Sequence, residues 1–401
     1  MNISTSTISQ TVSGAFKMNP FVFHCPTKIT FGEHTAATAA DLVKDLGCRK
    51  ALLVTDQVLV KSGVLQSVLS GFKEGEYLLY TDVPPDSDVD CVNSAARAAR
   101  EAGCDCVVAV GGGSVLDTAK VANICLSLGG DLLEYEGLNN LSEKLRPLIA
   151  IPTTAGTGSE VSMVAMVKDH TEGKKLLFGS RFLAPDAAIL DPILTVSLPP
   201  KLTAATGLDA LTHNIESFTA VISNSVFTDS LCLESMRLLF EHLPRATAYG
   251  EDLEARAATL IASTMAGLAF TNSGVGIVHA LAHATGAKYG THHGLTNSVF
   301  LPHGMHFNLD AVAARYAYLA RRLGFSTAAG DDEAAKELIE AVKQLSARVG
   351  LPSRLRDLGL PELKDGQLDE LAFLASTDPA IMFNPKESSI DDIIAIYERA
   401  Y

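Results

Sequence analysis

The chain has 401 residues, of which 47% are hydrophobic and 19% charged, so a large packed core is available and intrinsic disorder is not expected. Its formal net charge of −14 argues against a nucleic-acid partner, because neutralising phosphates needs clustered Lys and Arg. No apolar run approaches the roughly 18 residues of a membrane-spanning helix, so we expect no membrane association. The length suits two or three domains.

The first residues of the chain and its cysteines indicate the cellular compartment in which the protein is expected. Residues 1–17 are rich in Ser and Thr and lack both the apolar block of a secretory signal and the Arg of a transit peptide, so we expect a loose extension. The seven Cys are an odd number and lie mostly in apolar stretches, as reduced thiols do. We therefore expect a cytoplasmic protein. Cys104 and Cys106 form a C-x-C pair with no second pair at zinc spacing.

In the first half of the chain, short apolar runs alternate with helical patterns. The pattern at 90–101 predicts a helix. Strands separated by helices of this length favour βαβ units and a mostly parallel sheet. The expected strands are 51–55, 76–81, 106–110, 148–152 and 187–190.

After Pro199 and Pro200 the pattern changes. Apolar residues recur at spacings of three and four, and β-branched runs become rare, which is typical of helices. A double Pro is a plausible domain boundary, because Pro removes a backbone donor and restricts the residue before it. We therefore expect an α/β domain at 1–199 and an all-helical domain at 200–401. The expected helices are 229–239, 253–269, 311–323, 333–349 and 390–399.

One glycine-rich loop suits a phosphate. The strand expected at 106–110 runs into Gly111, Gly112 and Gly113, and Ser114 then opens a helical run as a suitable N-cap. Backbone without Cβ atoms can approach a ligand closely, and a helix start offers unpaired N–H groups, so the loop fits a pyrophosphate. The same pattern also fits a turn without a ligand. It is not the usual G-x-G-x-x-G fingerprint, so any dinucleotide fold must be a variant.

Two further segments fit a dinucleotide. A loop of hydroxyl-bearing residues and Gly follows the strand expected at 148–152, although an ordinary polar turn has the same composition. Asp56 follows the strand expected at 51–55. An acid at such a strand end accepts hydrogen bonds from a ribose and repels a 2′-phosphate, which favours NAD over NADP. Taken alone, Asp56 fits a solvated loop residue equally well.

Histidines gather in the helical half, where six of the chain's eleven lie close together in the sequence. Asp209 and His213 are four residues apart, as are His279 and His283, so each pair shares one face of a helix. His293 could add another ligand. One carboxylate with neutral imidazoles suits Zn²⁺ or Fe²⁺ better than Mg²⁺ or Ca²⁺. A site of one Asp and three neutral His would keep a net charge of +1 and act as a Lewis acid, but the pattern alone does not fix the ligands.

Together these segments resemble the iron-containing (group III) alcohol dehydrogenases. The resemblance runs from about Phe21 to the C-terminal helix and rests on the order and spacing of several motifs. It implies a Rossmann-like dinucleotide-binding domain, then a helical metal-binding domain, with the site in the cleft between them, in a homodimer or larger homo-oligomer. The motifs are VTD at 54–56, GGGSVLDTAK at 111–120, IPTTAGTGSE at 151–160, AILDP at 188–192, PPKLTAATGLDALTHNIES at 199–217, VHALAHATGAKYGTHHG at 278–294 and LPHGMHFN at 301–308.

The resemblance also implies roles for individual residues. His283 is implied to lie near substrate and nicotinamide and to relay a proton. The implied ligands of a divalent metal, Fe²⁺ with Zn²⁺ as the alternative, are Asp209, His213, His279 and His293. The implied NAD-binding residues are Asp56 at the adenosine ribose, Gly111, Gly112, Gly113 and Ser114 at the pyrophosphate, Asp117 in the helix behind them, and Thr153, Thr154, Ser162 and Lys175. Val164 and Phe270 are implied to line the substrate pocket.

The implied activity is the interconversion of a small primary alcohol or diol and its aldehyde, with hydride transferred to or from NAD. Val164 stands where some relatives have a polar residue, which argues against strong selectivity for a polyol. His292 replaces a Pro found in many relatives, and its role stays open. Two rival functions also stay open. One is a hydroxyacid–oxoacid transhydrogenase, and the other is a lyase of the dehydroquinate-synthase type, which needs a basic pocket although few Arg lie near the His residues.

Overall fold

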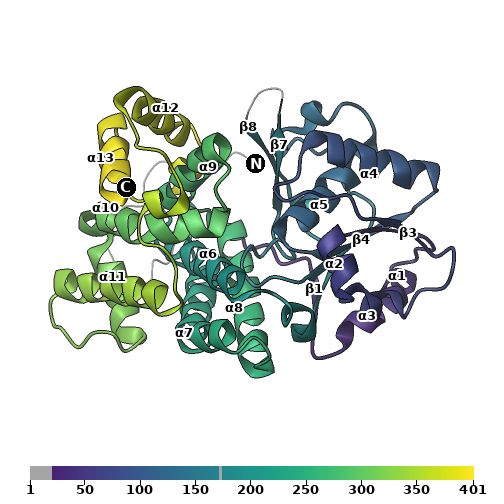
Figure 1. Ribbon diagram of the computed structural model, residues 1–401, viewed down its shortest axis with the longest axis horizontal. Coiled ribbons are helices and arrows are strands. Elements are labelled where there is room, and N and C mark those ends of the chain that lie inside the picture. Colours follow the sequence, from purple (N-terminus) through teal and green to yellow (C-terminus); the bar gives the residue numbers. More distant parts are fainter. Residues whose placement is uncertain (1–19, 171–173) are drawn as a thin grey trace.

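The computed structural model describes residues 20–170 and 174–401, and the extension expected at 1–17 lies outside them. An α/β half and a helical half lie side by side (Figure 1). The larger sheet has six strands, all parallel, in the order β1-β9-β6-β4-β2-β3. They are β1 (Lys28–Phe31), β2 (Ala51–Val54), β3 (Tyr77–Tyr80), β4 (Cys106–Gly111), β6 (Leu148–Pro152) and β9 (Ala187–Leu190).

The expected strands are confirmed. Interior strands such as β2 and β4 are buried on both faces, as parallel strands are, whereas the edge strand β3 is only partly buried. Side chains alternate along each strand, so Leu53 and Val108 face one layer of helices and Leu52 and Val107 face the other. Strand β1 was missed, because a four-residue edge strand with mostly exposed side chains has no strong apolar signal. The first layer contains α1 (Ala39–Asp45) and α3 (Leu65–Leu69), and the second α4 (Val89–Glu101) and α5 (Gly113–Leu128).

A second sheet of three strands was not expected from the sequence. Its strands are β5 (Gly137–Leu138), β8 (Lys174–Gly179) and β7 (Val164–Asp169), with β7 and β8 antiparallel. Asp117 of α5 accepts a hydrogen bond from the backbone N–H of Met166 in β7 at 2.9 Å. This bond ties the small sheet to the helix that follows the glycine loop.

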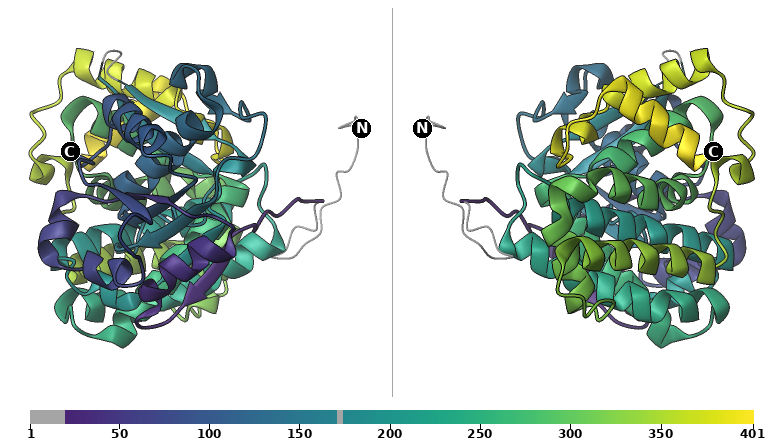
Figure 2. Two further views of the ribbon diagram at one scale, coloured as in Figure 1. Left: turned by 90° about the vertical axis from the view of Figure 1, so that its right-hand side faces the viewer. Right: turned by 90° about the vertical axis from the view of Figure 1, so that its left-hand side faces the viewer.

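The helical half begins at α6 (Pro200–Thr219), which places Pro200 in the first turn, where its missing N–H costs nothing. Helix α10 contains the helix expected at 311–323 but starts eighteen residues earlier and is distorted at Val312, whose φ is −133°. Figure 2 shows α12 and α13, in yellow, at one end of this half. The other helices are α7 (Val226–Ala248), α8 (Leu253–Ser273), α9 (Ile277–Tyr289), α10 (His293–Arg322), α11 (Asp331–Arg348), α12 (Asp365–Ser376) and α13 (Ile390–Ala400).

In the described part of the chain, no single helix combines the length and apolar composition needed to cross a membrane. Helices α8 and α9 meet that length and composition only as a pair, and the pair is bent by 101°.

The loop after β6 joins the two halves. Gly158 has a φ of +61°, and a Cβ there would lie 2.4 Å from the Cα of Gly267 in α8. Two hydrogen bonds add to this close approach. Thr264 Oγ1 of α8 donates to Glu160 at 2.6 Å, and Met163 N donates to Thr271 at 2.8 Å. Backbone segments can approach this closely only where both residues are Gly. The loop is therefore held tightly against α8, between the two halves.

Candidate active site

Three loops meet at the carboxyl edge of the large sheet. Strands β6, β4 and β2 are neighbours, so the segments after them, at Thr153, Gly111 and Asp56, lie in a row. Strand β3, the next in the chain after β2, lies on one side of β2, and β4 lies on its other side. The strand order therefore changes direction between β2 and β4. Such a switch point is where open α/β sheets bind ligands. Asp56 and the glycine loop, which were predicted to bind NAD, thus lie at the same edge of the sheet.

The glycine loop packs against the loop after β6. A Cβ on Gly112 would lie 3.1 Å from Thr154, and one on Gly113 would lie 2.7 Å from Thr157. The N-cap of α5 is Gly112, not Ser114 as predicted, and it makes no side-chain capping bond. The first N–H groups of α5 are therefore without a side-chain cap, as an anion site at a helix start requires.

Ser114 and Lys175 both contact the segment at Asp86. Ser114 Oγ accepts a hydrogen bond from Asp86 N at 3.0 Å. The Asp86 carboxylate pairs with Lys175 at 2.7 Å and with Lys168 at 2.5 Å. Although burial opposes it, these two ammonium groups lower the pKa of Asp86. Lys175 is therefore held in an ion pair at the position where the sequence predicted a cofactor-facing Lys.

Several predicted cofactor residues have structural partners. Asp56 accepts a hydrogen bond from Leu59 N at 2.9 Å and caps helix α2 (Gln57–Ser62). Thr153 is buried, and its N–H donates to Gly111 O at 3.0 Å. These bonds fix the strand ends on which the cofactor loops depend.

A buried polar cluster that the sequence analysis missed lies behind the loops. Lys120 is 1% exposed and donates to Ser162 Oγ at 2.9 Å, so the Ser162 hydroxyl is bonded inside the protein. Asp117 accepts from Ser159 Oγ at 2.7 Å. Burial lowers the pKa of Lys120 to about 8, although Asp117 and Glu160 oppose the shift. The D-x-x-K spacing in GGGSVLDTAK was the available signal, since it puts both charges on one helix turn.

The proposed metal ligands come from three helices. Asp209 and His213 lie on α6, His279 on α9, and His293 is the first residue of α10. One ligand atom each from Asp209, His213 and His279 lie within 4.8 Å of one another. His293 Nε2 is 3.4 Å from Asp209 Oδ1, and His279 Nε2 is 3.9 Å from the same oxygen. The four residues predicted from the sequence are thus brought together.

Two polar side chains support these ligands and were missed. Glu216, one turn beyond His213 on α6, lies 2.6 Å from His279 Nδ1. Although burial opposes it, Glu216 raises the pKa of His279. Asn297 Nδ2 donates to Asp209 at 2.7 Å and lies 3.1 Å from His293 Nε2. Carboxylate and amide partners of this kind fix the ring tautomers of metal-binding His.

The donor set fits a divalent cation. Glu216 contacts Nδ1 of His279, so the neutral ring carries its proton on that nitrogen and presents the Nε2 lone pair as the ligand atom, 3.9 Å from Asp209 Oδ1. Burial lowers the pKa of His213 and His293 well below the usual range, which keeps both rings neutral. The site thus contains more lone pairs than the two N–H groups of the Asn297 amide can hydrogen-bond. Such an excess of acceptors is typical of a cation site.

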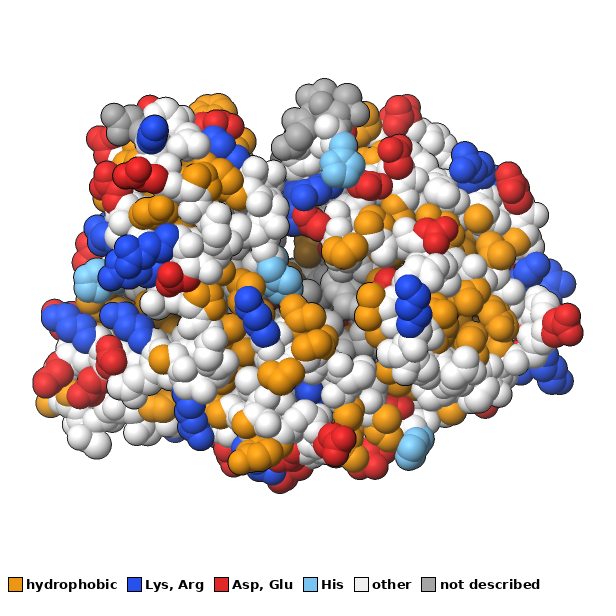
Figure 3. Space-filling view, viewed as in Figure 1, with side chains coloured by type: hydrophobic (Ala, Val, Ile, Leu, Met, Phe, Trp, Pro, Cys, Tyr) orange, Lys and Arg blue, Asp and Glu red, His pale blue; other side chains and the backbone are white. Residues whose placement is uncertain are grey.

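The cluster is open on one side. The side chains of Asp209 and His279 are 3% exposed, whereas those of His283 and His293 are 15% and 31% exposed. His283 and His293 stack with ring centroids 5.3 Å apart. Figure 3 shows the surface hollowed between the two halves of the molecule. A small molecule can therefore reach the cluster on the His283 side.

His283 has a carboxylate partner that the sequence analysis did not identify. Its Nδ1 lies 2.9 Å from Asp378 Oδ2, ninety-five residues later, just before the 3₁₀ turn Pro379–Phe383. Although burial opposes it, His283 lowers the pKa of Asp378. His283 and Asp378 therefore form an oriented pair beside the metal ligands.

The two pocket residues lie on different elements. Phe270 of α8, which was predicted to line the substrate pocket, stacks on His213 with ring centroids 4.4 Å apart, so it packs against the cluster. Val164 begins β7, opposite Gly179 of β8. The backbone of Gly156, in the loop after β6, lies beside the His213 ring. His292 is the N-cap residue of α10, directly before the ligand position His293.

Comparisons with known proteins identify the family to which this chain is similar. Family models described as iron-containing alcohol dehydrogenase and as the C-terminal part of the Fe-containing alcohol dehydrogenase family match residues 26–192 and 203–401. The NAD-dependent methanol dehydrogenase of Bacillus methanolicus is 36% identical, over 94% of this chain and 99% of its own. A 1,3-propanediol oxidoreductase structure superposes with a TM-score of 0.92 at 35% identity, covering 96% of this chain and 100% of its own.

A sulfoacetaldehyde reductase from Bifidobacterium kashiwanohense, solved with NAD⁺, superposes with a TM-score of 0.84 at 32% identity, covering 95% of this chain and 99% of its own. The predictions of an α/β domain followed by a helical domain, and of an alcohol–aldehyde oxidoreductase, are confirmed. The chain belongs to the iron-containing alcohol dehydrogenase family.

Proposed function

We propose that this protein interconverts a small primary alcohol or diol and its aldehyde, with NAD as the hydride carrier and Fe²⁺ as the resident metal. One observation carries the proposal. The Asp209–His213 helix lies against Gly156, in the loop that also packs on the glycine loop, so the metal ligands and the pyrophosphate site share one cleft. The names of relatives that act on methanol and on 1,3-propanediol support the substrate class.

The cofactor loops would position NAD across the cleft. The N–H groups at the start of α5 suit its pyrophosphate, and Asp56 lies where an adenosine ribose meets the end of β2. Thr153 and Thr154 follow β6 at the same edge, and Lys175 of β8, in the smaller sheet, reaches Asp86 in the segment after β3. An acid at Asp56 disfavours a 2′-phosphate, which supports NAD over NADP.

His283 is the proposed proton acceptor in alcohol oxidation. A carboxylate can only accept, so Asp378 holds the proton of His283 on Nδ1 and leaves the Nε2 lone pair free to take a proton. A divalent cation held by Asp209, His213, His279 and His293 would stabilise charge on the substrate oxygen, and NAD would accept the hydride. Phe270 would exclude water beside His213.

The test is nicotinamide absorbance with anaerobically Fe²⁺-loaded protein, assayed with short primary alcohols, diols and their aldehydes. NAD-linked turnover that depends on metal is expected, with NADP much poorer. A Zn²⁺-loaded sample decides between the two metals, and Asp209→Ala should lose metal and activity together. No turnover by protein that binds both metal and NAD would overturn the proposal and favour the transhydrogenase or the lyase.

We also propose that the protein works as a homo-oligomer in the cytoplasm. Exposed aromatic rings support self-association, because Phe21 and Phe227 are 42% and 55% exposed and lie 5.4 Å apart. The seven cysteines are all free thiols, which suits a reducing compartment. Light scattering of the holoenzyme would measure the oligomer, and a monomer at micromolar concentration would refute this part.

A further inference from the structure

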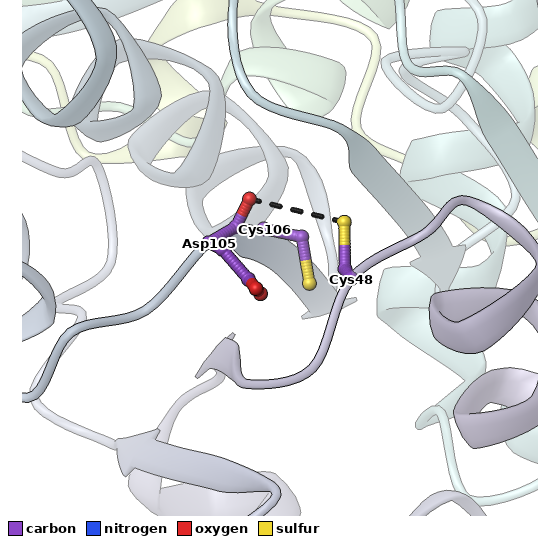
Figure 4. Close-up of side chains that lie close together, drawn as sticks. All are labelled: Cys48, Asp105 and Cys106. Atoms are coloured by element: carbon purple, nitrogen blue, oxygen red, sulfur yellow. Dashed lines mark hydrogen bonds between the residues drawn. The ribbon is translucent and has the colours of Figure 1, made fainter.

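A second cluster of metal-type donors lies at the amino ends of the parallel strands. Cys48 comes from the loop between α1 and β2, and Asp105 and Cys106 stand at the start of β4 (Figure 4). The two Sγ atoms and a carboxylate oxygen of Asp105 lie within 4.8 Å of one another. Of the two cysteines in the C-x-C pair, only Cys106 belongs to this cluster. Tertiary structure brings it close to Cys48, fifty-eight residues earlier in the chain.

The backbone holds this cluster in place. Strands β2 and β4 pair Ala51 with Cys106, so the residues before β2 lie beside the start of β4. Asp105 accepts hydrogen bonds from Arg49 N at 3.0 Å and from Lys50 N at 2.9 Å. Cys48 Sγ lies 3.8 Å from Asp105 O. The donors are therefore oriented by bonds that do not depend on a ligand, as a preorganised site requires.

Cys48 also borders a cavity. Its volume is about 180 Å³, and Lys44, Arg49, Phe72 and Glu76 are among the other residues that line it. Cys106 is 1% exposed and Cys48 8% exposed, so the thiols are shielded while Cys48 keeps contact with the cavity. The cavity has room for water molecules and reaches the cluster at Cys48, so it offers a route for a cation and a water ligand on that side.

We propose that Cys48, Asp105 and Cys106 bind a thiophilic divalent cation of the Zn²⁺ class. Two thiolates and a carboxylate with one water give the four ligands that Zn²⁺ prefers. Binding forms two metal–sulfur bonds and releases one proton from each thiol to the buffer, so two protons appear per cation. The three anionic ligands leave a charge of −1 on the complex, and the Arg49 guanidinium, 3.8 Å from Asp105, offsets it.

This site is separate from the catalytic metal. Cys106 begins β4 and Gly111 ends it, so five residues at ~3.3 Å each put about 16 Å of strand between this cluster and the glycine loop, and the proposed catalytic ligands lie on helices of the other half. The proposed catalytic ligands include no sulfur. A cation between Cys48 and Cys106 would join the α1–β2 loop to β4, so it would stabilise the sheet without touching substrate.

The experiment titrates Cd²⁺, a spectroscopic substitute for Zn²⁺, into the Fe²⁺-loaded holoenzyme. All samples carry Cys25→Ser, because Cys25 is an exposed thiol. We expect the ultraviolet sulfur-to-cadmium absorption band to saturate at one Cd²⁺ per chain, with two protons released. Cys48→Ala and Cys106→Ala should each lose most of the band. The matched control is Cys104→Ala, which removes a buried thiol two residues away that packs in a different cluster and should keep it.

A holoenzyme without the band, or with an undiminished band in both variants, would overturn the proposal. If either variant fails to fold, anomalous scattering from Cd²⁺ in crystals of the Cys25→Ser protein decides the matter. A peak between Cys48 and Cys106 supports the site, and Cd²⁺ only elsewhere refutes it. Because the band requires sulfur, its absence would leave the proposed dehydrogenase activity untouched.

Discussion

Among single residues, the His283–Asp378 pair is proposed to act in proton transfer and not in metal binding. Asp378 lies 2.9 Å from Nδ1, so the ring is oriented through that nitrogen. His283 is partly exposed beside the stacked His293, whereas the ligands Asp209 and His279 are deeply buried. His283 therefore lies on the open side of the site, as its proposed role of accepting a substrate proton requires.

His283→Ala should lower kcat by ~10²-fold or more, because positioned acid–base groups contribute ~10²–10⁴-fold. The variant should keep its metal. Asp378→Asn should cause a smaller loss, since the ring remains but its orientation is weakened. Steady-state kinetics with metal analysis of the same samples tests this. Loss of metal from His283→Ala would show that His283 is a ligand instead.

Glu216 supports the site through His279. Glu216→Gln should weaken metal binding ~10–100-fold, the usual loss when a carboxylate behind a ligating His is removed. The cause is the loss of the 2.6 Å contact that orients the ring. Competition with a chelator of known affinity measures the change. Glu241→Gln, on the surface of α7 and paired with Arg237, is the control and should bind metal normally.

At the scale of elements, the loop after β6 is fixed by the close approach of two glycines. Gly158→Ala should lower the free energy of unfolding by ~2–5 kcal/mol, because strained φ adds ~1–2 kcal/mol to overpacking of ~1–3 kcal/mol. The control is Gly63→Ala, which has a φ of +79° but no atom within 4 Å of the added Cβ, so it bears only the φ cost. Urea denaturation compares them, and equal losses would mean that the packing does not matter.

The β7–β8 sheet is tied to the segment at Asp86 by an ion pair whose strength depends on pH. The pKa of Asp86 is lowered below its ordinary 3.8, so the pair contributes stability above that pH and loses it as the pH falls through the folded-state pKa. Asp86→Asn should cost less than ~1 kcal/mol at pH 7, since the Asp86 side chain is 41% exposed and screened by solvent.

Urea midpoints of the native protein and Asp86→Asn, measured at pH 7 and near pH 3, test this sign. The difference should be present at pH 7, smaller in high salt, and smaller near pH 3 than at pH 7. A difference that grows on acidification would show that the carboxylate is not held in its charged form.

At the scale of the whole molecule, the metal ligands join three helices of one core. Asp209, His279 and His293 come from α6, α9 and α10, so a bound cation stabilises only the folded state. Removing the metal should lower Tm, because a ligand at a thousand times its Kd adds ~4 kcal/mol. Calorimetry with and without chelator measures the shift. Asp209→Ala should melt at one temperature in both conditions, and a chelator effect that persists there would contradict the ligand assignment.

The interior strands of the sheet, and the glycine-loop and Asp–His segments of the candidate site, could be predicted from the sequence. Strands such as β2 and β4 are buried on both faces, so their apolar runs are visible without a structure. The Asp209–His213 and His279–His283 spacings are local helix geometry, and the motifs around them identified the family. Edge strand β1 and the β5-β8-β7 sheet were missed, because exposed or alternating short strands carry little apolar signal.

Tertiary structure alone decided the partners of these groups. Asp378 reaches His283 across ninety-five residues and Glu216 reaches His279 across sixty-three, and no local pattern links positions so far apart. The N-cap of α5 is Gly112 and not the predicted Ser114, and the Ser162 hydroxyl accepts a hydrogen bond from Lys120, which the sequence did not indicate. In the same way, tertiary structure paired Cys106 with Cys48 rather than with Cys104. The periodicity of a sequence indicates on which face of a helix or strand a residue lies. Which residue it contacts there depends on how the helices and strands pack together.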